Sequence, residues 1–337
     1  MAKRGLTFWG ETASEYLDVA QQAEAAGFES VWTAEFHRTA FVPLAAAAVR
    51  TQRVRLGTGI ALSFVRSSLI TALTALDLDE LSGGRLVLGL GTGVQRLNED
   101  WHGVTYGRPV PHLRELVAVL RMFLAGVTKG GPLTFEGRYY RLNVHGYERP
   151  HPPVRERIPI YLAGIGPGMV RLAGEVADGW IGHDLNSPHY VNEVVVPRID
   201  EGLGRSGRSR ASFVLCPSVV CAIDHDPWEA RRIAAGHVAF YATVRTYAPF
   251  FTFLGFESAL PAIQSAFRAG DVRGMVNAVP SEMIDACTAT GTIDEVRAKV
   301  AEYEGVADLI KLSAPYHFLP PETVRAQQQA LIKLFAT

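Results

Sequence analysis

Cysteine is scarce in this chain of 337 residues, and neither sign of charge is in excess. The three cysteines, Cys216, Cys221 and Cys287, are odd in number and show no C-x-x-C spacing, which argues against a disulfide framework. The formal net charge is −1, and no run of Lys or Arg forms a basic stripe. These absences exclude the electrostatic footprint of a nucleic-acid or anionic-membrane binder, so we expect a small-molecule ligand.

Long apolar runs are also missing. No window approaches the roughly 20 apolar residues of a membrane span, and the amino-terminal segment turns polar at Glu11 before it could serve as a signal peptide. We therefore expect a soluble, cytoplasmic protein. The sequence contains no G-x-S-x-G motif, so we do not expect a nucleophile elbow. The histidines at 145, 151, 183 and 189 lack the spacing of a zinc site, so no metal is expected.

Apolar residues, at 48% of the chain, are abundant enough for a large core. Short β-rich runs alternate with longer helical stretches along the sequence. The predicted strands are 5–9, 28–33, 53–60, 85–93, 158–164, 178–183, 212–223 and 307–315. Nearly continuous apolar strands separated by helices are typical of a parallel sheet covered by helices. Eight such units favour an α/β fold of the closed (β/α)₈ TIM-barrel type, with an open doubly wound sheet as the alternative.

Two stretches exceed what a bare barrel needs, although we expect residues 1–337 to form a single domain. Residues 127–157 contain a predicted hairpin with Gly137 near its turn. Residues 247–290 are rich in apolar and aromatic side chains where a short connection would suffice. Insertions at the end of a barrel often serve as lids or pocket walls, and the alternative is a packed pair of satellite helices.

The tetrapeptide Leu-Gly-Thr-Gly occurs twice, each time at the end of an apolar run, at 56–59 and 90–93. The second copy extends a G-x-G-x-G pattern from Gly89, which does not match the G-x-G-x-x-G fingerprint of a dinucleotide-binding fold. In a barrel both copies lie at the carboxyl-terminal ends of strands, where active sites are built. Glycine there lets backbone N–H groups approach a ligand, or simply permits a tight turn.

Two other segments hold candidate chemistry. Glu35 and His37 follow the second predicted strand, where a carboxylate and an imidazole could bind a ring nitrogen or pass a proton. The alternative for Glu35 is a surface ion pair with Arg38. The second segment, Gly164-Ile165-Gly166-Pro167-Gly168, directly precedes a predicted helix, and N–H groups at a helix N-terminus form an anion site. A glycine loop without a ligand is the alternative there.

Four segments, GFESVWTAEFH, RVRLGTGIAL, LSGGRLVLGLGTG and IPIYLAGIGPGMVRLAGEVADGW, occur in an order and spacing that resemble the bacterial luciferase-like superfamily. The likeness extends over nearly the whole chain and is strongest to the branch that uses the deazaflavin F420. It implies a TIM barrel, usually a homodimer, with the cofactor at the carboxyl-terminal end of the strands.

The resemblance also implies particular cofactor contacts. It places a non-prolyl cis peptide bond at Gly59-Ile60, behind the tricyclic ring. It places Thr92 and Gly93, together with residues 164–168, around the phosphate-bearing tail. Many relatives carry an acidic residue followed directly by His after the second strand, whereas this chain has Glu35-Phe36 and carries its histidine at position 37.

The function that this resemblance implies is hydride transfer between F420 and a small organic substrate, a C=C bond, a C=N bond or an alcohol. Arg66 and Arg96, beyond the third and fourth predicted strands, could meet the carboxylates of the F420 tail. An FMN-dependent monooxygenase of the same fold is an alternative. A flavin-binding protein without turnover is another.

Overall fold

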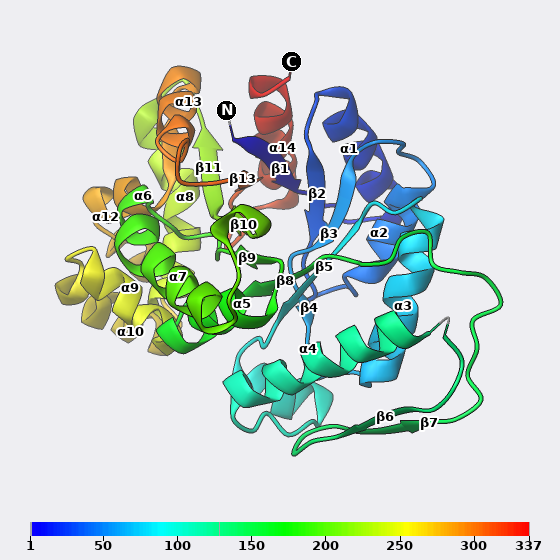
Figure 1. The fold of residues 1–337 in the computed structure, drawn as a ribbon. Helices are drawn as coiled ribbons and strands as arrows, with labels where there is room; N and C mark the ends of the chain where they lie inside the picture. Colours follow the sequence, from blue (N-terminus) through cyan, green and yellow to red (C-terminus); the bar gives the residue numbers. More distant parts are fainter. Residues whose placement is uncertain (1, 128, 337) are drawn as a thin grey trace.

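Eight strand positions form a parallel ring in the computed structural model, which describes residues 2–127 and 129–336 (Figure 1). The strands are β1 (Lys3–Thr7), β2 (Ser30–Thr33), β3 (Arg55–Thr58), β5 (Leu86–Gly91), β8 (Ile160–Ala163), β9 (Gly179–Ile181), β10 (Val214–Cys216) with β11 (Ser218–Ile223), and β13 (Leu309–Ser313). Each pairs in parallel with its neighbour in this order, and β13 pairs with β1.

The ring closes at Pro217, which divides one long strand into β10 and β11. On one side β10 pairs with β9, and on the other β11 pairs with β13. The carbonyl of Pro217 itself accepts the Lys311 N–H at 2.9 Å. Since proline has no N–H to donate to a ladder, it interrupts the strand while its carbonyl continues the pairing. The predicted (β/α)₈ barrel is confirmed, and the open sheet is excluded.

Helices lie outside the strands and connect them (Figure 1). They are α1 (Ala13–Ala25), α2 (Phe41–Ala48), α3 (Ser68–Leu81), α4 (Pro109–Gly126), α5 (Pro167–Val176), α6 (Pro188–Tyr190), α7 (Val196–Arg205), α8 (Pro227–Ala242), α13 (Ile293–Ala301) and α14 (Pro321–Leu334). Outward-facing strand residues such as Leu88 and Leu312 are fully buried against this layer. The first strand begins at Lys3 rather than at the predicted residue 5, because Lys3 already pairs with Leu309.

Inward-facing residues fill the barrel in layers. Inside the barrel, Trp32, Val87, Tyr161, Ile181, Cys216 and Leu309 form an apolar cluster. The repeated glycines fit around this cluster. A β-carbon on Gly57 would overlap the Trp32 ring, and one on Gly89 would overlap the carbonyl oxygen of Thr58. The packing therefore requires a glycine within the first tetrapeptide, at Gly57, and another directly before the second, at Gly89.

Both predicted insertions are present. Within the first, β6 (Leu133–Glu136) and β7 (Arg141–Val144) form an antiparallel hairpin beside α4, as predicted (Figure 1). Residue 128 of that stretch lies outside the described residues. The second insertion is helical, with α9 (Ala248–Phe253), α10 (Leu260–Arg268), α11 (Val272–Asn277) and α12 (Ser281–Cys287), and ends in the short strand β12 (Ala289–Gly291), which pairs with β11. A further two-residue strand, β4 (Ala61–Leu62), pairs with β5.

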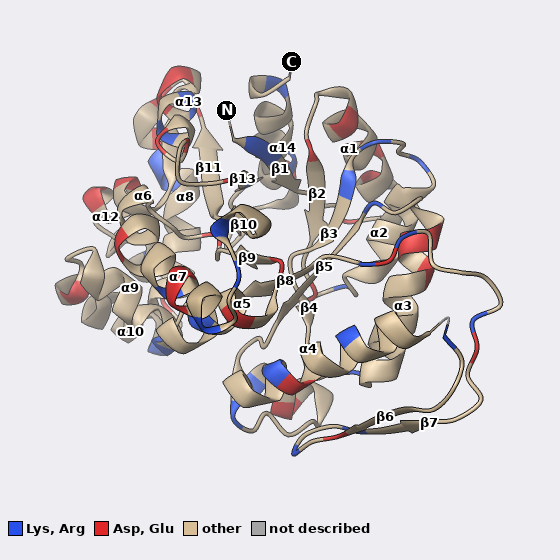
Figure 2. Cartoon of the chain, viewed as in Figure 1, with Lys and Arg blue, Asp and Glu red and all other residues tan. Residues whose placement is uncertain are grey.

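Positive and negative side chains are mixed over the helices, while the strands carry few of either (Figure 2). Within the described part of the chain, every helix is too short or too polar to cross a membrane.

Candidate functional site

The carboxyl-terminal end of the barrel gathers most of the residues that the sequence singled out. After β3 the chain forms a bulge in which the Gly59-Ile60 peptide bond is cis, as the resemblance implied. The Gly59 N–H donates to the Thr33 carbonyl at 2.6 Å, and the Glu35 N–H donates to the Ile60 carbonyl at 3.0 Å. The segments after β2 and β3 are thus fastened to each other.

Glu35 reinforces this connection with its side chain. One carboxylate oxygen accepts the Leu62 N–H at 2.8 Å, and the other forms an ion pair with Arg66. Arg66 also donates to the Leu62 carbonyl at 3.1 Å. The Glu35 side chain is 9% exposed, so it is not a surface charge, and its ionic partner is Arg66 rather than Arg38. Both oxygens are engaged in holding the bulge.

His37 and Phe36 lie on the exposed side of the same loop. Phe36 packs edge-on against His37, and its ring stacks on Trp101 with centroids 5.4 Å apart. Phe36 is 47% exposed and Trp101 is 61% exposed, so this aromatic pair is open to solvent. The other candidate arginine, Arg96, pairs with Asp100 on the surface and is not part of the bulge.

Thr92 and Gly93 lie just beyond β5, next to the bulge. The Tyr106 hydroxyl lies 3.1 Å from both the Thr92 hydroxyl and the Gly93 carbonyl. The Asn98 side-chain amide donates to the Thr92 carbonyl at 2.8 Å. Gly93 has a φ of 60°, a left-handed conformation that favours glycine. Neighbouring side chains thus fix this turn.

The loop 164–168 connects β8 to α5, with Gly166 at the N-cap and Pro167 at the first helical position. The Trp180 indole N–H fixes the loop by donating to the Gly164 carbonyl at 2.8 Å. A β-carbon on Gly166 would meet no atom within 4 Å, and one on Gly168 would meet only Val110. The loop therefore presents open backbone at a helix N-terminus, as predicted.

A cluster of polar rings at this end of the barrel was missed by the sequence reasoning. It consists of His183 after β9, His237 and Tyr241 on α8, Tyr247 from the 247–290 insertion, and Tyr316 and His317 after β13. The rings pack against one another with centroid distances between 4.2 and 5.3 Å. The Tyr241 and Tyr316 hydroxyls lie 3.2 Å apart. We call this set the histidine–tyrosine cluster.

Burial keeps the histidines of this cluster neutral. It lowers the pKa of His183 and of His237 to about 4, although the nearby Asp184 carboxylate opposes the shift. Burial, with His237, lowers the pKa of His317 to about 3, and His37 contributes to the same shift. His37 is therefore close enough to His317 to influence the pKa of that ring. The cluster presents uncharged hydrogen-bonding groups at neutral pH.

Beneath the cluster lies a buried ion pair inside the barrel. Lys311 of β13 and Asp184 after β9 approach to 3.4 Å, with their side chains 4% and 14% exposed. Burial alone would raise the pKa of Asp184, but Lys311 and the neighbouring histidines lower it to about 2. The Asp184 carboxylate is therefore ionised at neutral pH.

Several buried polar atoms at this end have no partner among the described residues. They include the hydroxyls of Thr7 at the end of β1, Ser63 just after β4 and Ser313 at the end of β13, and both ring nitrogens of His237. Buried polar groups are normally hydrogen-bonded, so unpartnered ones gathered at one end of the barrel are available to a bound molecule. Together with the open glycine loop, they suit a planar ring with hydrogen-bonding edges and an anionic tail.

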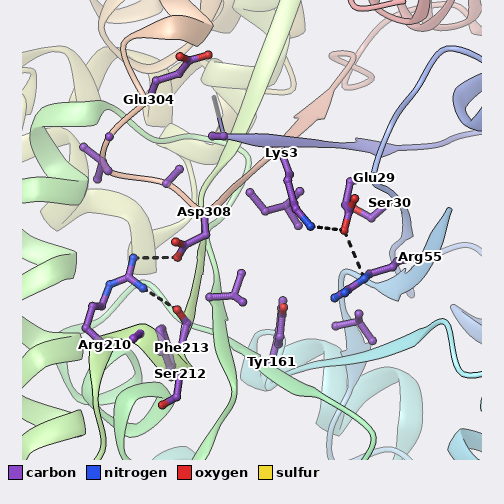
Figure 3. A pocket seen from close by; sticks show the side chains of 18 of the residues that line it. Lys3, Glu29, Ser30, Arg55, Tyr161, Arg210, Ser212, Phe213, Glu304 and Asp308 are labelled. Atoms are coloured by element: carbon purple, nitrogen blue, oxygen red, sulfur yellow. Dashed lines mark hydrogen bonds and ion pairs between the residues drawn. The ribbon is translucent and has the colours of Figure 1, made fainter. Parts of the chain in front are cut away.

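A cavity of about 820 Å³ opens at the opposite, amino-terminal end of the barrel (Figure 3). Lys3 and Arg55 pair with Glu29 on one side, Arg210 pairs with Asp308 on the other, and Tyr161 lies between them. Each of these charged side chains has an oppositely charged partner, and none of the predicted site residues lies there. The amino-terminal end of such a barrel generally serves stability.

Comparison with known proteins identifies the family of this chain. Residues 3–308 match the model of the luciferase-like monooxygenase family, and the chain belongs to that family. An F420-dependent glucose-6-phosphate dehydrogenase from Kineococcus radiotolerans is 34% identical over 63% of this chain and 65% of its own. A 5,10-methylenetetrahydromethanopterin reductase from Archaeoglobus fulgidus is 31% identical over 83% of each chain. The structure of the F420-dependent tetrahydromethanopterin reductase from Methanopyrus kandleri superposes with a TM-score of 0.84 over 100% of this chain and 97% of its own, at 24% identity.

Proposed function

We propose that this chain is an F420-dependent oxidoreductase that transfers hydride between the deazaflavin and a small organic substrate. Its sequence similarity to a relative named as F420-dependent, together with the unpartnered polar groups at the carboxyl-terminal end of the barrel, carries the proposal. The substrate class stays open among C=C bonds, C=N bonds and alcohols. The three cysteines are all free and buried, which is compatible with the cytoplasmic location that we also propose.

In this proposal Gly59 and Ile60 support the cofactor ring from behind. Thr92, Gly93 and the 164–168 loop hold the tail, with its phosphate at the N-terminus of α5. Two observations support this arrangement: the open space around Gly166 and the fixed turn at Thr92–Gly93. N–H groups at a helix N-terminus stabilise an anion by about 0.3–1 kcal/mol, and by up to about 2 kcal/mol when partly buried.

When bound, F420 supplies a carbon, C5, that accepts or gives up a hydride. The residues of the chain provide the setting for that chemistry. Glu35 acts as a positioning residue, because its carboxylate fixes the bulge under the ring. The histidine–tyrosine cluster offers uncharged donors and acceptors for a substrate oxygen or nitrogen. His37 is the proposed proton-transfer residue, since it lies near His317 and is exposed enough to exchange protons with water.

The family description itself favours one alternative, an FMN-dependent monooxygenase. That enzyme would need dioxygen and a reduced flavin. A flavin-binding protein without turnover is the remaining alternative, and it would bind a cofactor but leave the redox state of that cofactor unchanged in the presence of any substrate.

We also propose that the chain forms a homodimer through α2 and α3. These two helices pack side by side and expose large apolar side chains, with Val42 at 62%, Val49 at 59% and Ile70 at 53% exposure. Exposed apolar side chains gathered on adjacent helices mark an interaction surface.

The dependence of turnover on dioxygen distinguishes the proposed F420-dependent oxidoreductase from the FMN-dependent monooxygenase. Reduced F420 should be consumed at equal rates under argon and under air when the protein is given a panel of ketones, activated alkenes and imines. Consumption of reduced FMN that requires air, with none of reduced F420, would overturn the proposal. Absence of turnover with both cofactors across the panel, despite tight binding, would favour the non-catalytic alternative.

A further inference from the structure

Lys311 is a buried charge that the proposed reaction has not yet used. It lies in the middle of β13 with its side chain pointing into the barrel, two residues beyond Leu309 of the apolar cluster. Lys311 and Trp32 of that cluster both lie close to Gly59. Its neighbours across the two adjacent strands are Gly5 and Ser218, neither of which carries a charge.

The ammonium group lies directly beside the bulge. A β-carbon on Gly59 would be 3.6 Å from the Lys311 Nζ, so no side chain separates this cation from the backbone of Gly59. An ammonium has three N–H donors. Within residues 2–127 and 129–336, the one hydrogen-bond acceptor assigned to it is Asp184, at a long 3.4 Å. Donor capacity is therefore left over at the place where the chain supports the proposed cofactor.

A contribution to stability does not by itself explain why the chain buries the ion pair of Lys311 and Asp184. Removing two charges from water costs several kcal/mol per ion, and well-packed apolar residues of similar volume are often as stabilising as a buried ion pair. Trp32 and Gly59 lie close to the ammonium, and the nearby His183 is neutral. A positive charge retained inside a barrel, below its open end, points to a negative charge that it meets there.

We propose that Lys311 stabilises the negative charge of the reduced cofactor, and that Asp184 sets how strongly it does so. This inference rests on the proposed function. Hydride addition brings two electrons and one proton to C5 of the ring, and the displaced electron pair moves to the N1–C2=O segment. That segment then carries one negative charge unless it takes a proton from water. A fixed ammonium nearby favours this reduced anion over the neutral oxidised ring.

The test is the ratio of the affinities for oxidised and reduced F420, measured anaerobically by fluorescence and absorbance titration. Lys311→Met should weaken binding of reduced F420 about tenfold relative to oxidised F420, which corresponds to a potential about 30 mV more negative for the bound cofactor. Asp184→Asn, which leaves the ammonium uncompensated, should shift the ratio in the opposite direction. Lys299→Met serves as the matched control, because Lys299 lies on α13 outside the barrel and donates to the Asp285 carbonyl.

Opposite shifts in the two variants are the signature of electrostatics, since damage to the fold would change both in the same direction. If Lys311→Met fails to fold, the nearly isosteric Asp184→Asn still decides the matter through the sign of its shift. Unchanged ratios in folded variants, or shifts of the same sign, would overturn this inference and leave the proposed function intact. Wild-type protein that binds F420 in neither redox state would overturn both.

Discussion

Replacing Glu35 by Gln tests whether the carboxylate fixes the bulge rather than lying on the surface. The substitution keeps the shape of the side chain but removes the charge that pairs with Arg66, whose side chain is 19% exposed. Breaking a buried ion pair from one side costs about 3–5 kcal/mol. Because this pair retains some contact with water, we expect the free energy of unfolding to fall by about 2–3 kcal/mol. F420 affinity should fall as well, since the Leu62 N–H and the bulge lose their fixed acceptor.

Urea denaturation followed by circular dichroism measures the first effect, and titration with F420 measures the second. Asp100→Asn is the matched control, because it removes the partner of Arg96 in an ion pair whose side chains are 89% and 57% exposed. That change should alter stability by less than about 0.5 kcal/mol. If Glu35→Gln changes neither stability by more than about 0.5 kcal/mol nor F420 affinity, the positioning role assigned to Glu35 is wrong.

Three further predictions concern the cofactor loop, the buried histidines and the dimer. Gly166→Asp should weaken F420 binding about tenfold through bulk and charge repulsion. Gly204 also has open space around its β-carbon position, and Gly204→Asp should leave the F420 affinity measured by titration unchanged. Because His237 stays neutral when folded down to about pH 4 but gains a proton near pH 6.5 when unfolded, it should contribute up to roughly 3 kcal/mol to a loss of stability as pH falls from 6.5 to 4. His237→Phe should make the urea midpoint fall less over that range, with His183 and His317 causing the remaining fall, and an unchanged pH dependence would contradict the assignment. Val42→Glu with Ile70→Glu should give monomers in analytical ultracentrifugation, and an unaltered sedimentation coefficient would exclude this surface as the interface.

Local patterns were sufficient to predict the barrel. Its strands are apolar runs bounded by glycine or proline, and the hairpin of β6 and β7 turns where Gly137 indicated. Asp226 caps α8, where the sequence places it before Pro227, by accepting the Trp228 N–H at 2.9 Å. Strands of two or three residues, such as β4 and β12, leave no such pattern. Their pairing is set by neighbouring strands and not by their own residues.

The candidate site was only partly predictable, because its polar groups meet across long sequence distances. The loop 164–168 could be identified, since three glycines before a helix are a local signal. Asp184 and Lys311 are 127 residues apart, and their contact follows only from the closed ring of strands. Lys311 occupies a strand position where a charge contradicts the apolar pattern, and that contradiction was the one available sign. The pairing of Glu35 with Arg66 was hidden for the same reason.

The insertion at 247–290 contributes to both the end of the barrel and the outer helical layer. Tyr247 reaches the end of the barrel, where its ring lies 4.4 Å from that of His183. Phe250 and Phe251, by contrast, are 2% and 0% exposed and pack within the helical layer. Whether the segment closes over the substrate stays a prediction.

The most direct test of the central claim is a parallel titration of the purified protein with F420 and with FMN, followed by absorbance and fluorescence under identical conditions. Both molecules bring a tricyclic ring and a phosphate, so the comparison separates the two cofactors without knowledge of the substrate. Our account predicts saturable binding of F420 at lower concentration than FMN, with loss of affinity in Gly166→Asp. Tight binding of FMN with no measurable affinity for F420 would contradict it.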